Sequence, residues 1–234
     1  MTLNDIIGLL ASYIYAFGLL FFVEFIGKKL GWSTPFTRKL VHIGAGLWVW
    51  PIVLIFDHWY FGVIPFFTFI FLNYAFYRKQ SFSKMDSSDS TPGTVYFAFS
   101  ITTLFLLFWR SGSAHDRVYI ALAGTMAMTL GDAFASMIGM AWGKKQFHVF
   151  GNTKTLLGSG AMLVFSLLGI FFSLYLLSDQ PLFPVLCTIP TVKLFLYSLF
   201  AAGIATTAEA LSPVGTDNLS VPLLTGAALF FLIG

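Results

Sequence analysis

Residues 118–142 read VYIALAGTMAMTLGDAFASMIGMAW, and Asp132 is the one charged residue in this run. A helix needs about 20 mainly apolar residues to cross the hydrocarbon core of a membrane, so the run is long enough to span it. An ionisable side chain at that depth is costly and commonly has a functional role. The stretch therefore predicts a membrane-spanning helix that carries a functional carboxylate.

Seven other apolar runs accompany this one, at 6–26, 41–56, 59–76, 94–109, 155–177, 192–208 and 219–233. Asp5 directly precedes the first run, which has no basic start, so we expect a spanning helix rather than a cleaved signal peptide. The last run is short and contains Pro222, so it either spans with a tilt or only re-enters the membrane. We predict an all-α polytopic membrane protein with seven or eight transmembrane helices, forming one domain over residues 1–234.

The composition agrees with this prediction. The chain has 57% hydrophobic and 10% charged residues, with a mean hydropathy of +0.83, whereas a soluble domain carries about 25% charged residues. A soluble globular protein, a nucleic-acid-binding module and a disordered chain are therefore excluded. The single cysteine, Cys187, excludes a disulfide framework and a thiolate metal cluster.

The basic residues are distributed unequally between the two sides of the predicted bundle. Ten of the thirteen lie on loops that follow odd-numbered spans: Lys28, Lys29, Arg38, Lys39, Arg78, Lys79, Lys84, Lys144, Lys145 and Lys154. The other three are Arg110, Arg117 and Lys193. Because cytoplasmic loops carry the excess of Lys and Arg, we expect the odd-numbered loops in the cytoplasm and the N-terminus outside.

Small residues follow Asp132 along one helical face, at Ala135, Ser136, Gly139 and Gly143. Close packing against a neighbouring helix would explain the small residues. It would not explain the aspartate, which we interpret as functional.

A glycine-punctuated basic segment comes next, at residues 143–160 with the sequence GKKQFHVFGNTKTLLGSG. It runs into a predicted helix start, where backbone N–H groups and the helix dipole attract phosphate. Lys154 adds a charge and Thr155 or Ser159 a hydroxyl. The segment is not a P-loop, because GxxxxGK[ST] does not occur. The alternative is an ordinary basic loop with a threonine cap, which accounts for Lys144 better than for Lys154.

Two further groups lie beside predicted spans. Arg38, Lys39 and His42 stand at the start of the second span, where they could bind phosphate or anchor a lipid headgroup. Glu209 ends the seventh span, and a Pro- and Gly-containing turn then leads to Asp217 and Asn218. Carboxylates beside a phosphate site suit hydrated Mg²⁺, although Asp217 and Asn218 alone could simply form a turn and helix cap.

The ordered set of these motifs resembles the polyprenol kinase family, which includes phytol, farnesol and dolichol kinases and a CTP-dependent diacylglycerol kinase. The resemblance covers residues 38–222. The compact length of the chain and the Arg-Lys-x-x-His motif at 38–42 are most similar to the phytol kinase branch. It rests on RKLVH at 38–42, PGTVY at 92–96, GDAFA at 131–135 with Gly139 and Gly143, KT at 154–155 with Gly158 and Ser159, Glu209, and DN at 217–218.

The resemblance implies transfer of the CTP γ-phosphate, with Mg²⁺, to the hydroxyl of a lipid alcohol in the membrane. The partners are then CTP, the alcohol and membrane lipids, with no nucleic acid. The expected catalytic residues are Asp132, Lys154 and Glu209, and the expected metal ligands are Asp132, Glu209 and Asp217. The expected nucleotide-binding residues are Arg38, Lys39, His42, Gly131, Lys144, Asn152, Lys154, Thr155, Gly158, Ser159 and Asn218.

Two alternatives stay open at this point. A related phosphatidate or prenyl-phosphate cytidylyltransferase would also use CTP, but its C-terminal motif needs histidine and arginine. The chain has no histidine after His148 and no arginine after Arg117. A transporter or lipid-binding protein would place polar residues along a path through both leaflets, whereas most of the unusual ones here belong to one side.

Overall fold

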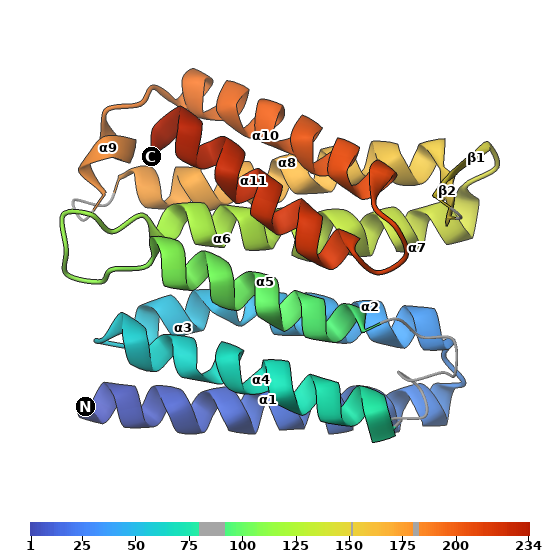
Figure 1. Cartoon of the computed structure of the whole chain (residues 1–234), viewed down its shortest axis with the longest axis horizontal. Coiled ribbons are helices and arrows are strands. Elements are labelled where there is room, and N and C mark those ends of the chain that lie inside the picture. Colours follow the sequence, from blue (N-terminus) through green and yellow to red (C-terminus); the bar gives the residue numbers. More distant parts are fainter. Residues whose placement is uncertain (80–91, 151, 180–182) are drawn as a thin grey trace.

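A computed structural model describes residues 1–79, 92–150, 152–179 and 183–234, which form a long bundle of helices (Figure 1). The helices are α1 (Leu3–Leu30), α2 (Thr34–Leu47), α3 (Val49–Ile55), α4 (Trp59–Lys79), α5 (Gly93–Phe108), α6 (Val118–Met126), the π-helix η1 (Ala127–Asp132), α7 (Ala133–Trp142), α8 (Leu156–Ser178), α9 (Pro184–Cys187), α10 (Thr191–Leu211) and α11 (Asp217–Ile233). The predicted all-α membrane fold is confirmed.

Each predicted apolar run corresponds to one helix or to two or three consecutive helices. Within the described ranges, six segments are long and apolar enough to cross a membrane, and α5 and α11 are shorter apolar helices of 16 and 17 residues. The helix α11 runs obliquely across the bundle (Figure 1). The second run is interrupted at Trp48, between α2 and α3. Pro51 explains this break, because a proline nitrogen cannot donate the helical hydrogen bond to the carbonyl four residues earlier.

The segment from Val118 to Trp142 lies at the centre of the fold. All nine residues of α6 are buried, and α6 packs against α5, α8 and α11. In contrast, 17% of the most apolar window of α1 is buried, against 89% for the Val118–Trp142 window. A helix that is apolar all round belongs in such an interior position. The run that predicted the fold class is therefore also the central helix of the bundle.

A short antiparallel hairpin is the one departure from all-α structure in the described part of the chain. It joins β1 (Gln146–Val149) to β2 (Asn152–Thr155), with Gln146 opposite Thr155 and Val149 opposite Asn152. The predicted phosphate loop is thus a hairpin that ends directly at the start of α8. This geometry fixes the direction of Lys154, in β2, toward the bundle.

The two ends of the bundle differ in charge as the sequence predicted. One end holds the hairpin, the last turns of α1 and α4, the start of α2 and the α10–α11 turn, whereas both chain termini lie at the other end (Figure 1). The described basic residues of the odd-numbered loops all belong to the first end, and Lys84 lies outside the described residues. Arg110, Arg117 and Lys193 belong to the second end. The side of the membrane that each end faces stays a prediction.

Candidate active site

Asp132 is the last residue of the π-helix η1 and is 3% exposed. Its carboxylate accepts a hydrogen bond from Lys39 Nζ at 2.6 Å and lies 3.7 Å from His42 Nε2. Both partners come from α2, one helical turn apart. A π-turn widens the helix locally and recurs at functional sites. Sequence reasoning singled out all three side chains but did not predict the π-turn, which shifts the phase of the helix ahead of Asp132.

Lys154 forms the second ion-pair group. Its ammonium group contacts Glu209 Oε1 directly and lies 3.7 Å from Asp217 Oδ2. Burial would lower the pKa of Lys154, but the neighbouring carboxylates of Glu209 and Asp217 outweigh it and raise this pKa above its ordinary value of 10.5. The side chain is therefore a permanent cation at neutral pH. Glu209 and Asp217 converge at Lys154 in the structure, as predicted from the turn between them.

The start of α8 lies beside these groups. Thr155 caps the helix by accepting a hydrogen bond from the Gly158 N–H at 3.0 Å. A Cβ on Gly158 would lie 2.9 Å from the carbonyl oxygen of Ala135, so α7 and α8 cross closely here. The small residues of α7 therefore serve helix packing, as the alternative interpretation proposed. The Ser159 hydroxyl is buried and has no hydrogen-bond partner among the described residues.

The two ion-pair groups line one polar pocket of about 430 Å³. Its wall includes Lys39 and Asp132 from one group and Lys154, Glu209 and Asp217 from the other. Three carboxylates thus face two lysine ammonium groups. Asn152 also lines the pocket, and its side-chain amide donates to the Ser212 carbonyl at 2.9 Å, which ties the hairpin to the α10–α11 turn.

The three expected metal ligands share this pocket but do not form a ready-made metal cage. In the described part of the chain, no three His, Cys, Asp or Glu side chains are grouped closely enough to hold an ion. Asp132 is paired with Lys39, and Glu209 with Lys154. Mg²⁺ commonly takes one or two carboxylates and completes its shell with water and phosphate. The carboxylates therefore fit an ion that enters together with phosphate.

Other expected nucleotide-binding residues lie outside the polar pocket. Lys144 is exposed and absent from its wall. Gly131 faces α8, where an added Cβ would lie 2.8 Å from Met162 Sδ. Arg38, His42 and Asn218 line a second cavity instead.

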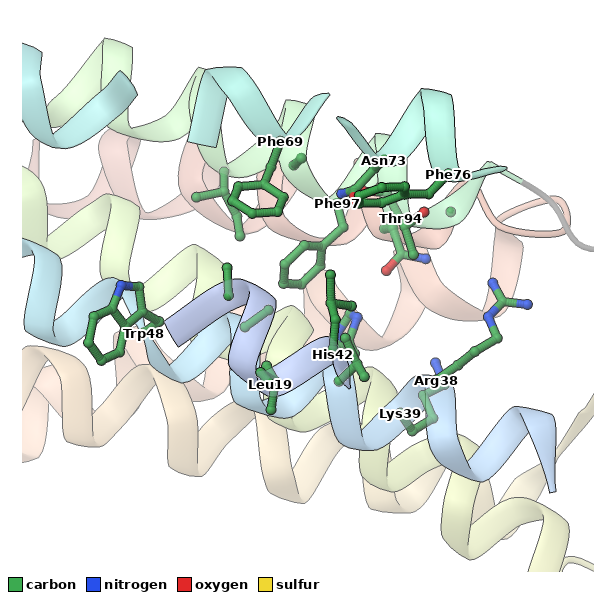
Figure 2. A pocket seen from close by; sticks show the side chains of 18 of the residues that line it. Leu19, Arg38, Lys39, His42, Trp48, Phe69, Asn73, Phe76, Thr94 and Phe97 are labelled. Carbon is green, nitrogen blue, oxygen red and sulfur yellow. The ribbon is translucent and has the colours of Figure 1, made fainter. Parts of the chain in front are cut away.

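This second cavity has a volume of about 440 Å³ and a mainly apolar wall formed by α1, α2, α4 and α5. Figure 2 shows Arg38 and Lys39 at one end, Trp48 at the other, and Phe69 and Phe97 between them. Sequence reasoning missed the aromatic lining. The available signal was the spacing of residues 38, 42 and 45 of α2 and of Trp48 directly after it, because these residues share one helical face.

The polar pocket and the apolar cavity meet. Their walls have five residues in common: Lys39, Ser136, Val214, Gly215 and Asp217. A polar ligand in one and an apolar ligand in the other would therefore come together beside Lys39 and Asp132.

Known proteins resemble this chain over most of its length. Phytol kinase from Synechocystis sp. is 30% identical over 97% of this chain and 91% of its own length. The chain belongs to the polyprenol kinase family. A probable chloroplastic phytol kinase from Triticum aestivum is 27% identical over 85% of this chain and 67% of that protein. The chloroplastic farnesol kinase of Arabidopsis thaliana is 26% identical over 69% of this chain and 54% of that protein. No family model and no solved structure matches the chain.

Membership of the polyprenol kinase family makes the protein a kinase with a lipid alcohol as acceptor. The resemblance deduced from the ordered motifs is confirmed. The cytidylyltransferase and the transporter, which the sequence left open, are both disfavoured, because the relatives described above are named as kinases.

Proposed function

We propose that this polyprenol kinase transfers the γ-phosphate of CTP to a prenol-type alcohol of the phytol or farnesol kind. The observation that carries the proposal is the junction of a charged pocket and an apolar cavity at Lys39 and Asp217. A nucleotide comes from water, whereas a lipid alcohol comes from the bilayer, so the enzyme needs two unlike cavities that share one boundary.

The polar pocket suits a triphosphate. Lys39 and Lys154 bring positive charge to it, and the positive end of the α8 dipole adds to this charge. The Leu156 and Gly158 N–H groups of this helix start are already bonded to the Lys145 carbonyl and the Thr155 hydroxyl. The buried Ser159 hydroxyl has an unused donor in the wall of the same pocket. Phosphoryl transfer depends mainly on positioning and charge neutralisation, which these groups would provide together with a cation held by the three carboxylates of the pocket.

The acceptor hydroxyl would lie at the junction, with its chain in the apolar cavity. The hydroxyl oxygen attacks the γ-phosphorus, the bond from that phosphorus to the β-phosphate oxygen breaks, and CDP leaves. Asp132 takes the hydroxyl proton, a role that requires hydrogen-bond reach to the alcohol. Lys39 Nζ donates a hydrogen bond to Asp132 at 2.6 Å and so orients the carboxylate. Mg²⁺, held by carboxylates of this pocket, would neutralise charge on the phosphates.

The preference for CTP is part of the proposal and is supported by the motif resemblance. The site end of the bundle also carries the excess of basic residues, which supports its facing the cytoplasm, where nucleotides are available.

Labelled nucleotide tests this proposal. Purified protein receives CTP labelled at either the γ or the α position, with phytol, farnesol, geranylgeraniol, undecaprenol or diacylglycerol. We expect label from the γ position in an isoprenoid alcohol and none from the α position. Label from the α position in the lipid would identify a cytidylyltransferase, and equal turnover with ATP and GTP would remove the CTP preference.

A further inference from the structure

The apolar cavity is open at the charged end and closed at the other. Near the mouth, Pro35, Thr94 and Val214 are exposed. At the inner end, Ser12 and Ile52 are 2% and 1% exposed and Pro65 is buried. A molecule whose hydroxyl lies beside Lys39 therefore extends its chain toward a buried floor.

Trp48, which is half-buried, forms part of this floor. It follows the last residue of α2, where the helix breaks before Pro51. The α2 backbone rises about 1.5 Å per residue, so the nine residues from Lys39 to Trp48 correspond to about 13 Å. Figure 2 shows the indole at the opposite end of the cavity from Lys39.

The Trp48 side chain is held in place from α1. Its ring stacks on Tyr15, with centroids 4.0 Å apart and planes inclined by 10°, and its Nε1 donates to Ser12 Oγ at 3.1 Å. Tyr15 is itself fixed by its hydroxyl, which donates to the Gly44 carbonyl at 2.8 Å. The indole is therefore a rigid wall rather than a mobile side chain, because its single donor is satisfied and its face is covered.

The space beyond the floor is filled. A Cβ added to Gly8 of α1 would lie 2.6 Å from the Phe56 ring, so α1 and the end of α3 pack tightly there. A longer chain that extends past Trp48 toward α1 and α3 meets this contact. Protein interiors are close-packed and resist such movement.

We propose that Trp48, positioned by Tyr15 and Ser12, sets the maximum length of the isoprenoid chain that the kinase accepts. The inference rests on the proposed function, since it takes the apolar cavity to hold the acceptor chain. A cavity of about 440 Å³ is in the range that encloses one small ligand. Short prenols fit between Lys39 and Trp48, whereas long polyprenols do not.

The test compares wild-type protein with Trp48→Ala and Trp48→Phe on a series from farnesol through geranylgeraniol to undecaprenol. Two substrates that differ by one methylene in an apolar pocket differ in kcat/KM by about tenfold or more. Trp48→Ala should therefore raise the kcat/KM of the longer alcohols, relative to that of farnesol, by at least about tenfold. Trp48→Phe should shift the ratio in the same direction by less. Turnover of farnesol should remain, because farnesol has the shortest chain of the series.

Trp142→Ala is the matched control. Trp142 is 68% exposed and lines neither cavity, so its truncation should leave the length profile unchanged. If the Trp48→Ala protein does not insert into the membrane, the chain-length profile of Trp48→Phe tests the proposal instead. An unchanged profile in an active variant would overturn the length-limiting role of Trp48. Wild-type protein that phosphorylates none of the alcohols would instead overturn the proposed function.

Discussion

Lys39 Nζ donates to Asp132 Oδ2 across 2.6 Å, although the two residues are 93 positions apart in the chain. The pair joins α2 to the π-turn of the central helix, with Asp132 in the wall of the polar pocket and Lys39 in the walls of both the pocket and the apolar cavity. A buried carboxylate needs such a partner, because an unpaired charge in the membrane interior is costly. The position of Asp132 in the proposed transfer step rests on this contact.

Asp132→Asn should abolish turnover while the protein still inserts and folds, because the amide keeps the volume but cannot accept a proton. A loss of proton acceptance alone leaves the Mg²⁺ requirement unchanged, whereas loss of a metal ligand raises it. Turnover measured over a magnesium titration separates these roles. Asp179→Asn is the control, because Asp179 is exposed and follows the far end of α8. Retention of more than a tenth of turnover would limit the contribution of Asp132 to less than ~1.4 kcal/mol.

Lys154→Met should lower turnover by about a hundredfold or more, the loss expected when one group that stabilises transferring charge is removed. Lys144→Met should have a milder effect, because Lys144 is exposed outside the polar pocket. Turnover at saturating CTP is the measurement. Small and equal losses at the two positions would contradict the phosphate-binding role of the hairpin.

Removal of Lys154 also leaves Glu209 without its cation, which destabilises a buried pair by about 3–5 kcal/mol. A Lys154→Met, Glu209→Gln double variant should therefore unfold at a higher temperature than Lys154→Met alone and remain inactive. Recovery of activity together with stability would show that Lys154 acts through folding rather than through phosphate.

Ser159→Ala should raise the KM for CTP several-fold without lowering thermal stability. The Ser159 hydroxyl makes no hydrogen bond within the described structure, so its removal costs no internal bond. Ser166→Ala is a control on the same helix, because Ser166 is fully buried and donates to the Met162 carbonyl at 2.6 Å. Ser166→Ala should lower thermal stability but leave the KM for CTP unchanged. Equal KM values for Ser159→Ala and wild type would remove Ser159 from the nucleotide site.

Topology gives an independent prediction. A protease-accessible tag inserted at 83–89, outside the described residues, should be reached from the cytoplasm, and an N-terminal tag from the outside. The expectation follows from the ten-to-three distribution of basic residues and the positive-inside rule. Protease protection in sealed vesicles is the measurement. Two tags on the same face would contradict the predicted orientation.

The membrane class, the apolar runs and the separation of basic residues between the two ends follow from the amino-acid sequence alone. These features depend on sums of local hydropathy and charge, which need no knowledge of the neighbours in space. The importance of Asp132, and the grouping of Glu209 and Asp217 near Lys154, could also be inferred. A carboxylate inside an apolar run is costly to bury, so its presence there indicates a function before its neighbours are known.

The distribution of these residues between two cavities depends on how the helices pack. Arg38 and Lys39 are adjacent in sequence, yet Arg38 lines only the apolar cavity whereas Lys39 lines both. Successive residues point about 100° apart around a helix, so the packing of α2 against its neighbours determines which cavity each side chain reaches. The π-turn before Asp132, the hairpin that carries Lys154 and the floor at Trp48 likewise arise from contacts between segments far apart in the chain, which hydropathy does not encode.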